Sequence, residues 1–352
     1  MGRPFGPGGN FLCALFFIHG CRRILLIGQV IRYPDVEDIL LFPHLDLNVE
    51  KLTVRLDDVQ CQKYCGIKFL PDLSKKAWFA TSNGLKCAST IFDDSDHNRN
   101  IYLWNPLIQK YKTLPDSPVP SPSHGKLWEA LAFGFVPELI DYVVVHIIKP
   151  YLRPNRHSII IGVYSLNTNS WKECTDQDNV FISKINSSED EVVFVNAAAI
   201  WVGVNSEKHK ILLRFDTKTN ILTEISLPDW IANRSLVPIP VIHLFGQSIA
   251  YFVWEDYESH FDMWVLKDDP TNEFTWEKKM CVCLSEFIML QVLGVRNNGG
   301  PILVKSYNLI SYNLDNHEAN DFVDSWRRWT EDSAPPYVIS PFVESLGLLN
   351  ID

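Results

Sequence analysis

Very few stretches of this chain combine residue types and spacing that could support catalysis. Ser123-His-Gly-Lys126 matches the S-x-x-K pattern, in which a lysine activates a serine nucleophile. It lies in a segment rich in proline and serine rather than at the start of a helix, so we interpret it as a chance match. The chain has no G-x-S-x-G, H-E-x-x-H, P-loop or G-x-G-x-x-G motif. We therefore expect no catalytic residues and no cofactor.

Metal binding would have to involve two close pairs of cysteines, Cys61 with Cys65 and Cys281 with Cys283. A structural zinc site needs two such pairs at finger-like spacing. These two lie far apart in the sequence, so we expect no metal site. The eight cysteines are scattered without framework spacing, which is typical of reduced thiols. This usage predicts a cytoplasmic protein, with the nucleus as a further compartment.

The other titratable residues form no cluster in the sequence. His146 and His243 sit inside apolar runs, which predicts core histidines with satisfied hydrogen bonds. The acidic pairs Glu255-Asp256 and Asp268-Asp269 fall in predicted turns, where solvated carboxylates are usual. Any chemistry would require residues that are distant in the sequence to converge.

The elements that would have to position such residues are short β-hairpins. The stretch from Ile101 to Pro115 has an apolar run, the turn signal Asn105-Pro106 and then an alternating run, which predicts strand, turn and strand. An aromatic residue or leucine at the end of an apolar run recurs about every 50 residues, the length of a kelch-type unit. The recurring positions are Leu56, Trp104, Tyr164, Phe215, Trp264 and Tyr312.

Six such units predict an all-β fold, a six-bladed kelch-like β-propeller with a short irregular N-terminal segment. We place the irregular segment at residues 1–36 and the propeller domain at residues 37–352. Small residues at 86–89 and 197–199 predict inner strands near a crowded axis, and the last strands should pair near residues 39–47 to lock the ring. The alternative is that the six hairpins build a large β-sandwich.

The composition limits the classes of partner. The chain has 352 residues, of which 46 % are hydrophobic and 12 % aromatic, as in an ordinary β-rich globular protein. Its net charge of −10 argues against nucleic acid and against an acidic membrane surface as partners. No apolar run is long enough to span a membrane. The apolar run at residues 11–18 leaves a secretory signal as an alternative, although no small-residue cleavage site follows it cleanly.

Eight short motifs occur in the same order as in a known family. They are Ser82-Asn-Gly-Leu85, Ile101-Tyr-Leu-Trp-Asn-Pro106, Tyr111-Lys-Thr-Leu-Pro115, Leu131-Ala-Phe-Gly-Phe135, Asp141-Tyr-Val-Val144, Val163-Tyr-Ser-Leu166, Asn169-Ser-Trp171 and Met263-Trp-Val-Leu266. From about residue 37 to residue 352 the chain resembles plant F-box proteins with an F-box-associated interaction domain. It is most similar to the S-locus F-box group of rosaceous plants, including the ending from Phe342 to Asn350.

The resemblance implies a substrate-receptor subunit of an SCF-type ubiquitin ligase, which binds a target protein and performs no bond chemistry. In the S-locus group the target is the pistil S-RNase, and segments near the C-terminus are thought to recognise it. By position, the resemblance carries this protein-binding role to Arg296, Asn297, Asn298, Trp326, Arg327, Arg328 and Trp329. For Trp326–Trp329 the residues alone favour a last strand with buried tryptophans and solvated arginines.

One feature departs from the family pattern. An F-box with a leucine-rich three-helix pattern should precede Glu37, and residues 1–35 contain none. Since the F-box docks on the Skp-type linker, the sequence leaves binding of that linker and of cullin open. Two alternatives to the receptor are a propeller enzyme with an acidic site on its axis and a truncated, non-functional paralogue.

Overall fold

The computed structural model describes most of the chain from residue 77 onward and two earlier segments. The described residues are 23–29, 39–45, 77–90, 100–105, 110–118, 127–150, 159–174, 182–185, 192–232, 241–254, 260–268, 274–283, 290–295, 299–305, 308–314, 316, 318–321 and 337–342. Within them the secondary structure is strand apart from one short helix, α1 (Asp229–Ala232). No helix in these segments has the length and apolar character needed to cross a membrane.

The strands form antiparallel sheets made of segments that follow one another in the chain. Three of these sheets contain β3 (Ala77–Ser82), β4 (Leu85–Thr90), β5 (Ile101–Asn105) and β6 (Lys110–Thr113); β7 (Leu127–Val136), β8 (Asp141–Pro150), β9 (Ile160–Ser165) and β10 (Ser170–Cys174); and β11 (Ile182–Ile185), β12 (Val192–Val195), β13 (Ala198–Asn205), β14 (Lys210–Asp216) and β15 (Ile221–Ser226). The other three contain β16 (Val241–Phe245), β17 (Ser248–Trp254), β18 (His260–Asp268) and β19 (Phe274–Cys283); β20 (Leu290–Val295), β21 (Pro301–Lys305), β22 (Asn308–Tyr312) and β23 (Ala319–Asp321); and β1 (Arg23–Gln29), β2 (Ile39–Leu45) and β24 (Tyr337–Phe342).

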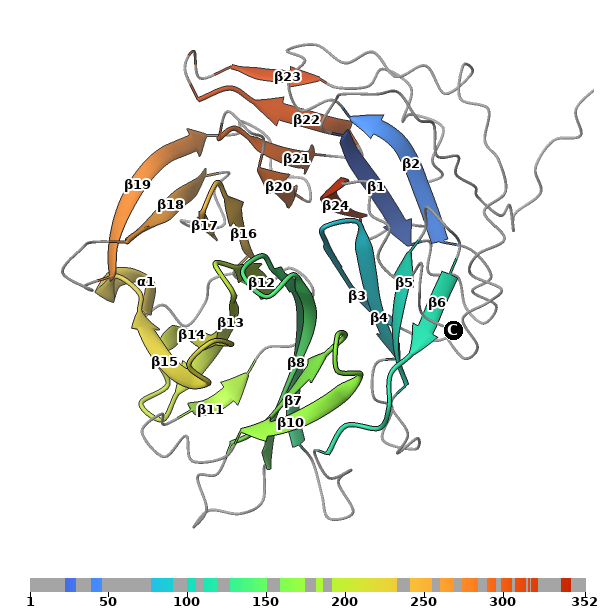
Figure 1. The fold of residues 1–352 in the computed structure, drawn as a ribbon. Helices are drawn as coiled ribbons and strands as arrows, with labels where there is room; N and C mark the ends of the chain where they lie inside the picture. The colour runs from blue at the N-terminus through green and yellow to red at the C-terminus, as the bar shows by residue number, and fades with distance from the viewer. Residues whose placement is uncertain are drawn as a thin grey trace, which may run out of the picture.

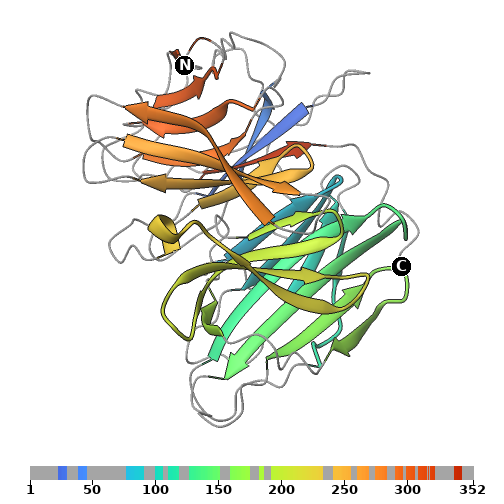
Figure 2. The same cartoon turned by 90° about the vertical axis from the view of Figure 1, so that its left-hand side faces the viewer.

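The sheets are arranged around a common axis, as Figure 1 shows, and Figure 2 gives the view turned by 90°. One strand of each sheet lies innermost, and each innermost strand contacts the next in the order β3, β7, β12, β16, β20, β24 and back to β3. This arrangement confirms the predicted all-β propeller. The count of six blades stays a prediction, since the described part of the sheet β2-β1-β24 has only three strands.

The recurring aromatic position marks the third strand of a sheet. The predicted hairpin from Ile101 is confirmed, because β5 pairs with β6 in antiparallel register and Trp104 faces Tyr111. Tyr164, Phe215, Trp264 and Tyr312 lie in β9, β14, β18 and β22, each the third strand of its unit. Leu56 lies outside the described residues. The period therefore reflects one supersecondary unit that is repeated around the axis.

The ring is closed by strands from the two ends of the chain. β24 pairs with β1, with Ile24 opposite Pro341, and β1 also pairs with β2. Closure by the last strand was predicted, but β24 pairs with β1 and not with the strand at residues 39–45, which lies on the other edge of β1. The expectation of an irregular segment at residues 1–36 misses β1, whose apolar run Ile24-Leu-Leu-Ile27 suits a central strand paired on both edges. The domain boundary at residue 37 stays a prediction.

Small residues do not mark the inner strands, contrary to the prediction. Residues 86–89 lie in β4 and Ala198 and Ala199 in β13, and both strands are second from the axis. The run from Val192 to Val202 is a hairpin that turns at Asn196 and Ala197, which have positive φ angles of 50° and 58°. From composition alone, two short apolar strands joined by a two-residue turn with positive φ angles look the same as one long apolar strand.

Hydrophobic clusters fill the spaces between successive sheets, and indole N–H groups connect the same sheets. Trp201 Nε1 donates to the Leu131 carbonyl of the preceding sheet at 3.1 Å, and Trp276 Nε1 donates to the Ser226 carbonyl at 2.9 Å. Trp171 Nε1 donates at 2.7 Å to the carbonyl of Pro115, just after β6. The clusters around Trp201 and Trp276 also join side chains of the two sheets that each indole connects. Each of these tryptophans thus combines apolar packing with a directional bond between neighbours in the ring.

The two histidines predicted to be core residues are satisfied in the structure. His146 contacts Ser117 and Glu129, and His243 Nε2 lies 3.1 Å from the carbonyl oxygen of Val292 in the next sheet. Burial lowers the pKa of His243 from 6.5 to about 4, although its hydrogen bond to Val292 acts in the opposite direction. His243 is therefore neutral at pH 7 and donates from Nε2.

We expect this histidine to make the fold sensitive to mild acid. Because its pKa is lower in the folded state than in the unfolded chain, the unfolded chain takes up the proton first as the pH falls. The free energy of unfolding should be constant above about pH 6.5 and fall toward pH 4 by at most about 3 kcal/mol from this residue. Denaturant titrations at several pH values measure the loss. His243→Gln keeps an N–H donor for Val292 and should show a smaller loss, so equal pH profiles would contradict the assignment.

Candidate functional site

One end of the propeller is formed by tight turns that contact one another from sheet to sheet. We call this end the turn face and define it by the turns between β3 and β4, β7 and β8, β9 and β10, β12 and β13, β14 and β15, and β16 and β17. In a four-stranded antiparallel unit, the first and third turns lie at the same end. The connections from second to third strands, such as that at residues 206–209, lie at the opposite end.

The first contact on the turn face joins the turn of β3 and β4 to the next sheet. Asn83 and Gly84 have φ angles of 43° and 84°, as in the Asn-Gly turn predicted from the sequence. The Tyr142 hydroxyl donates to the Asn83 carbonyl at 2.7 Å, and the Phe135 N–H donates to Ser82 Oγ at 2.9 Å. The sequence thus specifies a turn whose backbone also holds the neighbouring sheet.

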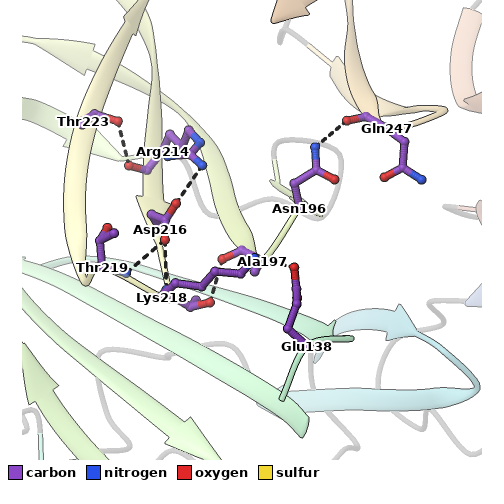
Figure 3. A network of polar contacts seen from close by, with 10 residues as sticks. Glu138, Asn196, Ala197, Arg214, Asp216, Lys218, Thr219, Thr223 and Gln247 are labelled. Atoms are coloured by element: carbon purple, nitrogen blue, oxygen red, sulfur yellow. Dashed lines mark hydrogen bonds and ion pairs between the residues drawn. The ribbon is translucent and has the colours of Figure 1, made fainter. Parts of the chain in front are cut away.

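The next contacts join the sheet β7–β10 to the sheets β11–β15 and β16–β19, and Figure 3 shows them together. Lys218 Nζ, in the turn of β14 and β15, lies 2.5 Å from Glu138 Oε1 in the turn of β7 and β8. The hydrogen bond from Lys218 lowers the pKa of Glu138 below its usual value. Asn196 Nδ2 donates to the Gln247 carbonyl of the following sheet at 2.8 Å. Side chains of one turn therefore bond to the next turn around the face.

Asp216 shapes the turn that carries Lys218. Its Oδ1 accepts hydrogen bonds from the backbone N–H groups of Lys218 and Thr219 at 2.9 and 3.1 Å, and its Oδ2 accepts from Arg214 Nη2 at 2.9 Å. Burial alone would raise the pKa of Asp216, but these hydrogen bonds and the Arg214 charge lower it below its usual value. The carboxylate is thus committed to holding the turn and is not available as a general base.

The turn of β7 and β8 presents two large apolar side chains to solvent. Leu139 is 60 % exposed and Ile140 is 75 % exposed, the highest values among the large hydrophobic residues that the structure describes. Ile140 has a φ of 48°, a left-handed conformation that is strained for a β-branched residue. Asn167 Nδ2 lies 3.4 and 3.3 Å from the Leu139 and Ile140 carbonyls, and the buried Asp141 carboxylate accepts from Ser165 Oγ and from Asn167 N–H. The neighbouring turn therefore fixes this apolar tip in place.

Replacing Ile140 with asparagine should stabilise the protein. Asparagine adopts the left-handed conformation more readily, and the side chain that is lost is mostly exposed, so we expect the free energy of unfolding to rise by about 1 kcal/mol. Denaturant unfolding measures this change. Ile140→Val keeps the β-branch and the strain and should leave stability near wild type, whereas a destabilised Ile140→Asn protein would show that the isoleucine packs in a way its exposure does not reveal.

A second polar cluster lies at the other end of the space between β3–β6 and β7–β10. His146 Nε2 lies 2.5 Å from Glu129 Oε1, and His146 Nδ1 lies 2.9 Å from Ser117 Oγ. The side chains of His146 and Glu129 are only 6 % and 9 % exposed. Serine, histidine and carboxylate in this order could in principle activate the hydroxyl as a nucleophile. The same contacts also anchor the segment after β6 to the innermost strand β7, which is a structural role.

The structure does not describe the residues to which the sequence assigned protein binding. Arg296, Asn297, Asn298, Trp326, Arg327, Arg328 and Trp329 lie outside the described segments. Of the cysteines considered for metal binding, Cys61 and Cys65 also lie outside them. Among the residues that are described, no three His, Cys, Asp or Glu side chains gather in a way that could hold a metal ion.

The family is shown by a match that covers most of the chain. The family model of the F-box associated β-propeller domain matches residues 41–325. The chain belongs to this family. F-box associated propellers are protein-interaction modules in general, and the match includes every turn that defines the turn face.

Solved structures show only a distant likeness to this F-box associated propeller. Puromycin hydrolase is 8 % identical with a TM-score of 0.43, over 69 % of this chain and 38 % of its own, so the chain spans well under half of that enzyme. The α-L-arabinanase of Penicillium chrysogenum is 11 % identical over 71 % of this chain and 80 % of its own, with a TM-score of 0.41. The fucose-binding lectin of Aleuria aurantia is 10 % identical over 77 % of this chain and 79 % of its own, with a TM-score of 0.37. No curated protein matches the chain.

Sequence reasoning missed the exposed pair on this F-box associated propeller. The sequence at residues 137–140 indicates only a Pro-Glu turn between two apolar runs. The available signal was that two of the four turn residues, Leu139 and Ile140, are large and apolar, although turns favour Gly, Asn, Asp and Pro. A turn that departs from turn chemistry in this way is a candidate for a functional position.

Proposed function

We propose that this chain is the target-binding part of an SCF-type ubiquitin ligase, where it holds a target protein and carries out no bond chemistry. Membership of the F-box associated propeller family is the observation that carries the proposal. The rigid turn face with its exposed apolar pair supports it, because recognition residues usually lie on loops held by a stable scaffold. The family role, rather than a residue of this chain, supplies the link to ubiquitin.

The finer assignment follows the sequence motifs. We propose that the chain is a plant protein close to the S-locus F-box group, that it acts in the cytoplasm or nucleus, and that its target is similar to an S-RNase. Docking to a Skp-type linker and cullin is the step that would connect target binding to ubiquitin transfer.

A pull-down tests the ligase connection. The full chain is mixed with a Skp-type linker and cullin, with a full-length family member as positive control and circular dichroism as a check of folding. Binding comparable to that of the control supports the receptor role. A folded chain that fails to bind would contradict the ligase connection and leave a protein-binding propeller, such as a decoy or a non-functional paralogue.

The Ser117–His146–Glu129 cluster is the specific observation that favours an enzyme as second candidate. A hydrolase of this kind would use Ser117 Oγ as nucleophile and His146 as the base that accepts its proton. A fluorophosphonate probe, which modifies activated serines, distinguishes the two candidates. We expect no labelling of the wild-type chain. Labelling that disappears in Ser117→Ala but not in Ser206→Ala would instead establish the hydrolase.

A further inference from the structure

We propose that the turn face, centred on Leu139 and Ile140, is the surface that binds the target, and that the occupant is a folded protein with an uncharged, apolar pocket. This inference rests on the proposed function and adds to it which end of the ring binds and which chemistry is recognised. The two side chains would enter the pocket as anchors, and the surrounding turns would form the rim of the interface.

The first argument is the exposure of these side chains together with their rigidity. Ile140 has a left-handed φ of 48° although its side chain is 75 % exposed. Strain of this kind is typical of ligand-binding and switch positions. The amide of Asn167, the Asp141 carboxylate and the ion pair of Glu138 with Lys218 hold the turn from two directions. A fixed apolar tip loses little conformational entropy on binding, which favours its use as an anchor.

The second argument is the charge of the rim. The turns at residues 137–140, 166–169, 196–197, 217–220 and 246–247 contain two charged side chains, Glu138 and Lys218, and these pair with each other. Apart from Pro137 and the apolar pair, the other exposed side chains of these turns carry amides or hydroxyls, namely Asn167, Thr168, Asn169, Asn196, Thr219 and Gln247. This part of the surface is therefore neutral although the whole chain carries −10. A neutral rim around an apolar centre matches a partner patch that is also uncharged, because an unpaired charge on the partner would lose hydration without compensation.

The same observations favour a protein over other macromolecules. A nucleic acid would require several unpaired lysines or arginines, and the one lysine of these turns is bonded to Glu138. A membrane surface would require a broad apolar face with basic residues, whereas this tip offers two adjacent side chains. Two rigid apolar anchors within a polar rim fit a pocket on the surface of a folded protein, so we take a folded protein as the partner.

Site-specific crosslinking tests the location of the interface. A benzophenone amino acid replaces Thr168, beside the apolar tip, or Ser206, which is exposed at the opposite end of the ring. Each full-length protein is irradiated in cells of its tissue, and crosslinked partners are identified by mass spectrometry. We expect one protein to be captured from position 168 and not from position 206. Capture of the same protein only from position 206, or no protein captured from position 168, would overturn the inference.

Once crosslinking has identified the partner, the affinity of the purified, uncrosslinked partner for this chain tests the anchor role. Ile140→Asn should weaken its affinity at least ~10-fold, since truncated anchor residues commonly have effects of this size. Lys208→Asn is the matched control, because Lys208 is also exposed with a positive φ of 68° but lies at the opposite end. It should leave the affinity within ~2-fold, the size of change usual for a residue outside the contact. Equal affinity of Ile140→Asn and wild type would overturn the proposal.

A vesicle experiment distinguishes binding of lipid from binding of a protein. The pull-down distinguishes failure of this inference from failure of the proposed ligase role. If the chain co-sediments with phosphatidylcholine vesicles and Ile140→Asn abolishes this, the tip binds lipid and the protein-partner proposal fails. A partner captured at position 168 by a chain that does not bind the Skp-type linker would support the turn face while contradicting the ligase role. A chain that binds the Skp-type linker but captures a partner only at position 206 would support the ligase role and contradict the turn face as the binding surface.

Discussion

Replacing Trp201 with alanine is expected to lower the free energy of unfolding by about 4 kcal/mol, the cost usual for deleting a fully buried tryptophan. The side chain has no exposed surface and lies in the hydrophobic cluster between β7–β10 and β11–β15. The variant also loses the indole donor to the Leu131 carbonyl of the innermost strand β7. Denaturant unfolding followed by circular dichroism measures the loss, which should appear in the midpoint and not in the slope.

Trp201→Phe separates packing from the hydrogen bond. Phenylalanine keeps most of the volume and removes the N–H donor, so its loss should be about 1–2 kcal/mol and well below that of alanine. If the alanine variant lost less than about 1 kcal/mol, the tryptophan could not be a principal contact between these sheets.

Replacing Gly134 with alanine should also be severely destabilising, through crowding near the axis. A Cβ atom at this position would lie 1.8–2.2 Å from three atoms of the Phe194 ring, far inside contact distance. Gly134 lies on β7 and Phe194 on β12, two innermost strands that contact each other. Since either the ring or the strand must move, we expect a loss of about 3 kcal/mol or more.

A double-mutant cycle tests whether the Phe194 ring causes the destabilisation by Gly134→Ala. Gly134→Ala should cost little in the background of Phe194→Ala, because the clashing ring is then absent. Gly246→Ala is the matched control. Gly246 has a φ of 60° with open space around it, so its loss should reflect backbone strain and should not depend on Phe194. Additive effects of Gly134→Ala and Phe194→Ala would contradict the crowding explanation.

The fold was largely predictable because its local signals agree with its global arrangement. Trp104, Tyr164 and Phe215 recur at the length of one blade, and Asn83-Gly84 provides an unambiguous turn. The inner strands were not predictable in this way. Crowding near the axis depends on the contact of Gly134 with Phe194, two residues far apart in sequence, whereas runs of alanine describe only composition.

The candidate site was much less predictable than the fold. The φ of Ile140 and the contacts of Asn167 with the preceding turn result from tertiary packing and leave no pattern in a single sequence. What the sequence does show is the anomaly of Leu139 and Ile140 within a turn. The residues proposed from family resemblance, Arg296–Asn298 and Trp326–Trp329, lie outside the described residues, and their protein-binding role stays a prediction.

The pairing of β1 with β24 has a consequence for how the protein folds during synthesis. β1 is made long before β24, so its edge next to β24 is satisfied only when Tyr337–Phe342 has been translated. Until then, an apolar strand with an unpaired edge is exposed, which favours association with other chains. Pairing of two strands so far apart in the sequence is also slow, because the entropy of closing the long loop is lost before the new contacts form. We therefore expect ring closure to be the late step of folding and the step that depends most on chaperones.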